Sequence, residues 1–195
     1  MKLIAITSEG SISREVERII TILDGGFDYV HIRKPSYTLE QTRELINAIP
    51  SQYHRRLKLH DYFELTREFD LGGVHLNSRN PNAPLGCGMV SRSAHSAEDI
   101  AMAEGGYEYI TLSPIFDSIS KVGYNSNFTK SELQHIITNY ADKDIIALGG
   151  INDKNIAKVQ ELGFAGAAIL GYLFSEMDIT ELKKRIKYAT IYHTR

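Results

Sequence analysis

The sequence predicts a single-domain α/β protein, a compact (β/α)8 TIM barrel with a short or missing fourth helix. Eight short apolar runs of strand length alternate with helical patterns along the 195 residues, and such alternation is typical of a parallel sheet flanked by helices. An open doubly wound sheet would also satisfy the pattern, but the number eight favours the barrel. Because eight such units use up the chain, we expect residues 1–195 to form one domain.

Most of the apolar runs are rich in β-branched or aromatic residues, which favour strands. In chain order the predicted strands are 3–7, 29–33, 57–61, 73–77, 90–95, 109–116, 145–151 and 166–174.

Helical periodicity fills the spaces between the strands. The spacing i, i+3, i+4, i+7 places apolar side chains on one helix face, and it occurs at Val16, Ile19, Ile20 and Leu23. The same spacing or a capping box predicts further helices that begin after Thr38 and span 129–140, 153–162 and 179–186. Segment 78–89 has two prolines, two glycines and no helical pattern, so the fourth helix is expected to be short or missing.

Composition and charge restrict the class of protein. The chain is 43% hydrophobic and 24% charged, with a formal net charge of −2, which is ordinary for a soluble globular protein and a poor match to nucleic-acid binding. No apolar stretch is long enough for a membrane helix, and the first residues do not resemble a signal peptide. The single cysteine, Cys87, excludes a disulfide framework. We expect a cytoplasmic protein that acts on small molecules, with a homo-oligomer left open.

Polar side chains gather where the predicted strands end, which is where barrels and open α/β sheets carry their sites. Singly, each has a structural explanation: a histidine can bond a loop carbonyl, Arg33 can be a strut, and Asp61 can cap the next helix. Their occurrence at six strand ends favours a functional site. The residues are His31, Arg33, His60, Asp61, His75, Asn77, Ser93, His95, Asp117, Ser118, Ser120, Lys121, Gly149, Gly150 and Gly171.

Two segments predict a phosphate site. Segment 117–121 supplies two hydroxyls and an ammonium group, and glycines occupy the turns Gly149-Gly150 and Leu170-Gly171. In barrels the loops after the seventh and eighth strands often hold a phosphate through backbone N–H groups.

The metal signal is weaker. Asp61 and Asn80 could offer oxygens to Mg²⁺ together with a substrate phosphate. The histidines lie on separate strands and include no H-x-H pair in the first strand, so their spacing does not predict zinc.

In this combination the motifs resemble the thiamine-phosphate synthase family and its sister group, the TenI-like thiazole tautomerases, over nearly the whole chain. The motifs are LIAITSE (3–9), HIRKP (31–35), HD (60–61), GVHLNSRN (73–80), SAHS (93–96), SPIFDSISK (113–121) and GGI (149–151).

The resemblance implies an enzyme of thiamine biosynthesis that joins hydroxymethylpyrimidine diphosphate to thiazole phosphate and releases pyrophosphate, so its partners are phosphorylated thiamine precursors. It also implies roles for the candidate residues. Arg33, Ser93 and Lys121 would hold the pyrophosphate, Asp61 would bind Mg²⁺, and His31 would face the pyrimidine. The thiazole phosphate would be held by Ser118, Ser120, Gly149, Gly150, Leu170 and Gly171.

Three positions depart from the synthase pattern, all in the pyrophosphate and metal half. Asn80 replaces a metal carboxylate, His60 replaces an asparagine, and Pro35 replaces a lysine that neighbouring Lys34 would partly compensate. A thiazole tautomerase, which needs no pyrophosphate site, is therefore the alternative.

In the tautomerase, Mg²⁺ would be weak or absent and a histidine would move the proton. The sister group's own catalytic histidine is Pro114 here, so the proton would fall to His31, His60 or His95. A non-catalytic binder of thiazole or thiamine phosphate is the third alternative.

Overall fold

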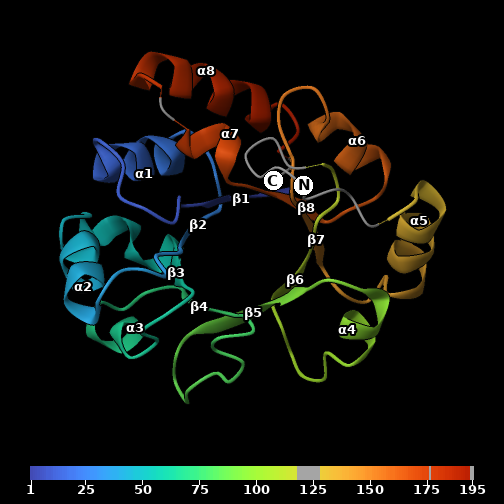
Figure 1. Ribbon diagram of the computed structural model, residues 1–195, viewed down its shortest axis with the longest axis horizontal. Coiled ribbons are helices and arrows are strands. Elements are labelled where there is room, and N and C mark those ends of the chain that lie inside the picture. The colour runs from blue at the N-terminus through green and yellow to red at the C-terminus, as the bar shows by residue number, and fades with distance from the viewer. Residues whose placement is uncertain (118–127, 176, 194–195) are drawn as a thin grey trace.

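Eight parallel strands form a closed ring in chain order, and β8 pairs with β1 to complete it (Figure 1). The computed structural model describes residues 1–117, 128–175 and 177–193. The predicted barrel is therefore confirmed, and the open sheet is excluded. The strands are β1 (Lys2–Ile6), β2 (Tyr29–Ile32), β3 (Leu57–Leu59), β4 (Gly73–Leu76), β5 (Met89–Ala94), β6 (Tyr109–Leu112), β7 (Ile145–Leu148) and β8 (Gly166–Ile169).

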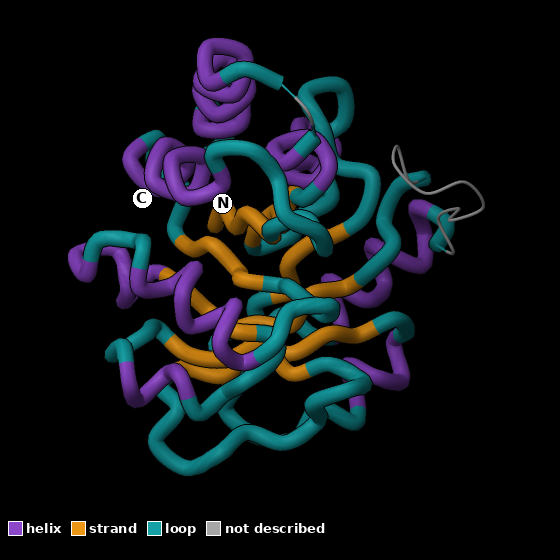
Figure 2. Tube along the Cα trace, turned by 60° about the vertical axis from the view of Figure 1, so that its left-hand side comes forward, coloured by secondary structure: helices purple, strands orange, loops and turns teal. Residues whose placement is uncertain are grey.

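Helices cover the outside of the ring (Figure 2). Thr38 and Thr129 begin α2 and α5 with the predicted capping boxes. Across the described ranges, no helix has both the length and the apolar character needed to cross a membrane. The helices are α1 (Glu15–Asp24), α2 (Leu39–Asn47), the 3-10 helix η1 (Ser51–Arg56), α3 (Leu65–Glu68), α4 (Ala97–Ala101), α5 (Lys130–Asn139), α6 (Ile156–Glu161), α7 (Gly171–Phe174) and α8 (Ile179–Thr190).

Two connections shape the end of the barrel that carries the site. Residues 77–88 link β4 to β5 without a helix, as predicted (Figure 1). The predicted strand 166–174 is too long: β8 ends at Ile169, and α7 follows after Leu170. A continuous apolar run does not distinguish a strand from a buried helix, which explains the error. As a result, a short extra helix begins where β8 opens onto the site.

The buried apolar residues form two clusters. The larger fills the layer between the strands and the helices. The smaller lies inside the ring and contains Ile4, Ile6, Tyr109, Ile146 and Ala168. These come from β1, β6, β7 and β8, so one side of the barrel interior is mainly apolar.

The opposite side of the interior is polar. Lys58 of β3 is fully buried and pairs with Glu108, just before β6. Burial of the ammonium group lowers the pKa of Lys58, which the pairing with Glu108 opposes. His31, Ser91 and Thr111 are likewise fully buried. The apolar residues of the same strands face the helices instead.

Candidate active site

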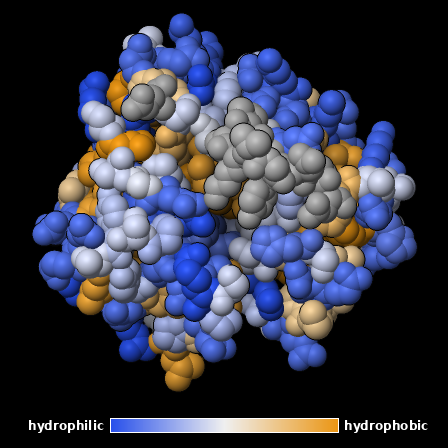
Figure 3. Space-filling view, viewed as in Figure 1, coloured by the Kyte–Doolittle hydropathy of each residue, from blue (hydrophilic) through white to orange (hydrophobic). Residues whose placement is uncertain are grey.

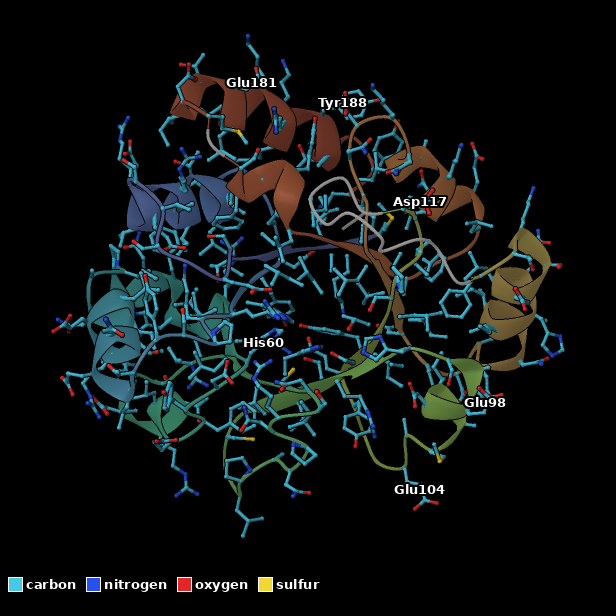
Figure 4. All side chains as sticks on the ribbon, in the orientation of Figure 1. His60, Glu98, Glu104, Asp117, Glu181 and Tyr188 are labelled. Carbon is cyan, nitrogen blue, oxygen red and sulfur yellow. The ribbon has the colours of Figure 1, made fainter. Side chains whose placement is uncertain are left out.

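A cavity of about 440 Å³ opens where the strands end, a size suited to a small ligand. Figure 3 shows a hollow near the middle of this face, with hydrophilic residues beside it. Figure 4 shows His60 inside the ring of strands, whereas Glu98, Glu104 and Glu181 lie at the periphery of the molecule. Ten of the predicted site residues line the cavity: Arg33, His60, His75, Asn77, Ser93, His95, Gly149, Gly150, Leu170 and Gly171.

Arg33 follows β2 and is held by β1. Its backbone N–H donates to Thr7 Oγ1 at 2.9 Å, and the Thr7 hydroxyl donates to the Arg33 carbonyl at 3.2 Å. The guanidinium Nη1 lies 2.8 Å from Glu9 Oε1. The Arg33 side chain is 24% exposed and lines the cavity.

The predicted metal ligands, Asp61 and Asn80, contact each other but do not line this cavity. They line a neighbouring hollow, and Arg79 lines both. Arg79 Nη2 lies 3.1 Å from each carboxylate oxygen of Asp61, and Asn80 Nδ2 donates to Asp61 Oδ1 at 2.8 Å. Asp61 does not cap α3, whose N-cap residue is Glu64. Its carboxylate therefore serves to hold a guanidinium beside the cavity.

Three histidines form the floor of the site. His31 Nδ1 lies 2.9 Å from His60 Nε2, and His31 Nε2 lies 2.6 Å from the hydroxyl of Tyr109. His75 Nδ1 lies 2.9 Å from Ser91 Oγ, and its Nε2 lies 3.0 Å from Ser93 Oγ. His60 and His75 line the cavity, whereas His31 lies behind them and does not.

Burial keeps these three imidazoles neutral. Removal from water lowers the pKa of His75 to about 3, with a smaller effect of the Lys58 charge. The same desolvation takes the pKa of His31 and His60 well below the usual value, and the neighbouring histidines add to it. At neutral pH the floor of the cavity is therefore an uncharged set of imidazoles.

Ser93 and His95 extend the cavity wall along β5. Ser93 Oγ reaches His75, as above, and is oriented by it. His95 Nδ1 lies 3.1 Å from the carbonyl of Ser113, and its backbone N–H donates to Asp99 Oδ2 at 2.7 Å. His95 thus bonds a loop carbonyl, as a strand-end histidine commonly does, while still lining the cavity.

Glycines form the opposite wall. Gly149 and Gly150 have φ of 103° and 65°, in the region that favours glycine. A Cβ at Gly150 would lie 2.3 Å from the carbonyl oxygen of Asp117, so the β6 and β7 loops can meet only if this residue has no side chain. Gly171 begins α7 beside them. This is the arrangement that barrels use to hold a phosphate after strands seven and eight.

Lys34 does not take the place of the missing lysine at Pro35. It is 2% exposed, and its Nζ lies 2.5 Å from Glu15 Oε1 and 2.6 Å from the carbonyl of Gly10. Lys34 lies away from the cavity, where it joins the β2 end to α1. Ser118, Ser120 and Lys121, the other predicted phosphate ligands, lie outside the described residues.

Sequence reasoning missed several polar residues of the cavity wall, among them Arg79, Glu9 and Tyr172. Arg79 lies in the helix-free segment after β4, two residues beyond Asn77. The Asn77 side chain folds this segment back, because its Oδ1 accepts from the Arg79 N–H at 3.1 Å. The closeness of this arginine to a predicted strand end could have identified it as a site residue from the sequence.

Comparisons with known proteins agree with this geometry. The family model described as thiamine monophosphate synthase matches residues 3–173. A thiamine-phosphate synthase of Alkaliphilus oremlandii is 27% identical over 84% of this chain and 82% of its own. One of Clostridium tetani is 25% identical over 80% of this chain and 78% of its own.

Solved structures show the same relationship. A thiamine phosphate pyrophosphorylase from Bacteroides thetaiotaomicron superposes with a TM-score of 0.85 and 33% identity, covering 100% of both chains. One from Pyrococcus furiosus gives a TM-score of 0.80 at 20% identity, covering 97% of this chain and 94% of its own, and supports the fold. With the family model covering most of the barrel, the chain belongs to the thiamine monophosphate synthase family.

Proposed function

We propose that this protein is a thiamine-phosphate synthase, which couples a hydroxymethylpyrimidine diphosphate to a thiazole phosphate. The thiazole nitrogen forms a bond to the exocyclic methylene carbon of the pyrimidine. The bond from that carbon to the diphosphate oxygen breaks, and its electron pair leaves with pyrophosphate. We place this chemistry in the cytoplasm, since both substrates are small phosphorylated molecules.

The observation that best supports this proposal is the distribution of charge around the cavity. Arg33 and Arg79 lie on the wall formed by the β2 and β4 ends, and the glycine turns lie on the wall formed by the β7 and β8 ends. Arginine suits the bidentate binding of a diphosphate. A glycine turn beside a short helix suits a monophosphate. The two walls thus match the two phosphorylated substrates.

The reaction needs little from the protein beyond position and charge. Carbon–oxygen cleavage places positive charge on the methylene carbon and negative charge on the leaving oxygen. The two arginines, already fixed by Glu9 and Asp61, can stabilise that negative charge without reorganisation. Holding the thiazole nitrogen against the carbon supplies the rest, because proximity removes much of the entropic barrier.

The residues present fit Mg²⁺ poorly. Mg²⁺ prefers about six oxygen ligands and is usually held by carboxylates together with substrate phosphates. Here both oxygens of Asp61 accept from Arg79, and Asn80 presents its amide nitrogen rather than its oxygen to that carboxylate. We therefore assign to Arg79, rather than to Mg²⁺, the role of the cation that stabilises the leaving pyrophosphate.

Thiazole tautomerisation is the second candidate, favoured by one observation. Neutral imidazoles of His60 and His75 face the cavity, and a neutral imidazole can accept a proton from a ring carbon. A transferase that releases pyrophosphate does not require such a base.

A product assay distinguishes the two candidates. The protein is incubated with both synthase substrates, and thiamine phosphate and pyrophosphate are measured; separately, the thiazole carboxylate tautomer is incubated and its conversion followed by absorbance. Equal amounts of the two synthase products support the proposal. Tautomer conversion without pyrophosphate release overturns it in favour of the isomerase, and rates equal to buffer in both assays leave only a binding role.

A further inference from the structure

The transfer reaction described above does not use the three-histidine cluster of His31, His60 and His75, although its three imidazole rings converge closely. The three buried imidazoles come from successive strands of the ring: His31 lies in β2, His60 directly follows β3, and His75 lies in β4. One ring nitrogen from each lies within 4.8 Å of the other two. The ring centroids of His60 and His75 are 4.5 Å apart, and that of His31 is 4.9 Å from His75. Such convergence is unusual for neutral side chains that serve only to fill a core.

We propose that the three-histidine cluster binds one divalent transition-metal ion of the zinc class. Three imidazole nitrogens with one open position are the ligand set of catalytic zinc sites. The same set suits cobalt, nickel and copper, whereas Mg²⁺ and Ca²⁺ require oxygen ligands. The site is therefore different in place and chemistry from the Asp61 carboxylate.

The surroundings orient two of the three ligands as a metal site requires. Metal-bound histidines almost always hydrogen-bond through their second ring nitrogen, which fixes the tautomer. His31 Nε2 lies 2.6 Å from Tyr109 Oη and His75 Nδ1 lies 2.9 Å from Ser91 Oγ. These bonds leave His31 Nδ1 and His75 Nε2 to face the ion. His60 Nε2 completes the set, since it already lies 2.9 Å from His31 Nδ1.

The adjustment needed on binding is small. Zinc–nitrogen bonds of about 2.0–2.1 Å in a tetrahedral site place two ligand nitrogens about 3.4 Å apart. The His31–His60 pair, at 2.9 Å, must therefore open by a few tenths of an ångström, and the widest pair must close by on the order of 1 Å. The charge of Lys58 below the cluster is balanced by its ion pair with Glu108, so it opposes the ion only weakly.

The open position of the ion faces the cavity. His60 and His75 line the cavity floor, and Ser93 Oγ lies 3.0 Å from His75 Nε2 at its edge. A water molecule, or an oxygen, nitrogen or sulfur atom of the cavity ligand, would take that position. The ion would thus lie at the contact between the barrel interior and the bound substrate.

Cobalt titration tests the proposal. Metal-free protein is titrated with Co²⁺ and followed by its visible d–d bands, and zinc binding is measured by calorimetry. We expect one ion per chain, the strong bands of four- or five-coordinate cobalt, and a zinc-induced rise in Tm. His60→Asn and His31→Gln should abolish the bands. Tyr109→Phe, which removes only the partner of His31, should weaken zinc binding by about 10- to 100-fold.

Matched controls separate this site from other histidines. His95→Gln changes a cavity histidine outside the cluster, and His135→Gln changes an exposed histidine on α5; neither should alter the bands. Circular dichroism of each variant shows whether it folds. If the folded wild-type protein gives no d–d bands, or if the bands survive His60→Asn and are lost in a control variant, the cluster is a hydrogen-bonded network and the proposal is wrong.

Discussion

Arg79 binds Asp61 through both carboxylate oxygens, each 3.1 Å from its Nη2 atom. The pair places a fixed positive charge where the resemblance implied a metal ion. Arg79→Ala should therefore weaken the binding of inorganic pyrophosphate by about 10- to 100-fold, the loss expected for hydrogen bonds to a charged group. Calorimetry without added metal measures it. Arg55→Ala, which breaks an exposed ion pair with Asp70, is the control, and equal affinities in the two variants would contradict the role of Arg79.

Asn80→Asp should convert this corner into a magnesium site. The new carboxylate would lie about 3 Å from Asp61, so that two mutually repelling negative charges would share the single Arg79 guanidinium. We expect the variant to lose about 1–2 kcal/mol of stability without Mg²⁺ and to recover it with millimolar Mg²⁺. Thermal unfolding with and without the ion measures the effect. Asn82→Asp changes an exposed residue of the same loop, and Mg²⁺ should not alter its thermal stability. If Mg²⁺ stabilises Asn80→Asp no more than the wild type, the prediction is wrong.

Gly150→Ala should damage the phosphate wall. Alanine is strained at φ of 65°, and its Cβ would meet the Asp117 carbonyl oxygen at 2.3 Å. We expect a loss of about 1–3 kcal/mol in stability together with weaker binding of a thiazole phosphate. Gly106→Ala, where a Cβ meets nothing within 4 Å, is the matched control. Urea unfolding and ligand titration of both variants provide the comparison. If phosphate binding is unchanged in Gly150→Ala, the glycine turn does not bind the phosphate.

Removing one charge of the buried Glu15–Lys34 pair should lower the unfolding free energy more than replacing both residues with apolar ones. Glu15→Gln leaves the Lys34 ammonium group buried without a counter-charge, which costs about 3–5 kcal/mol. The double variant Glu15→Leu/Lys34→Met removes both charges and should recover most of that loss. Urea unfolding measures it. Glu17→Gln, on the same helix, breaks an exposed pair with Arg14 and should cost at most about 1 kcal/mol. If Glu15→Gln loses no more unfolding free energy than Glu17→Gln, the buried pair is not maintained in solution.

Much of the fold followed from local pattern. The alternation of apolar runs and helical segments favoured a ring of eight strands, and the two prolines and two glycines of segment 78–89 indicated that the helix after the fourth strand is short or missing. Strand-end chemistry also led to most of the cavity wall, because parallel strands bring their carboxyl ends to one face.

Contacts between residues far apart in the chain could not be predicted from the sequence. Lys34 and Pro35 are neighbours in the chain, but whether Lys34 meets a substrate or Glu15 depends on where α1 packs. The position of Arg79 depends on a turn made by the Asn77 side chain. The three histidines have no shared spacing, because the strands that bring them together are separated by loops of different length.

The polar side of the barrel interior has a consequence for how the strands align. His31 of β2 is opposite Ile6 of β1 and Lys58 of β3, and it bonds both His60 and Tyr109. A one-residue slip of β2 would turn His31 toward the helices and place Ile32 against the polar groups. An interior of interchangeable aliphatic side chains would penalise such a slip only by imperfect packing. Here every misaligned ring leaves buried donors without acceptors, so the histidine cluster beneath the cavity also selects the correct strand register.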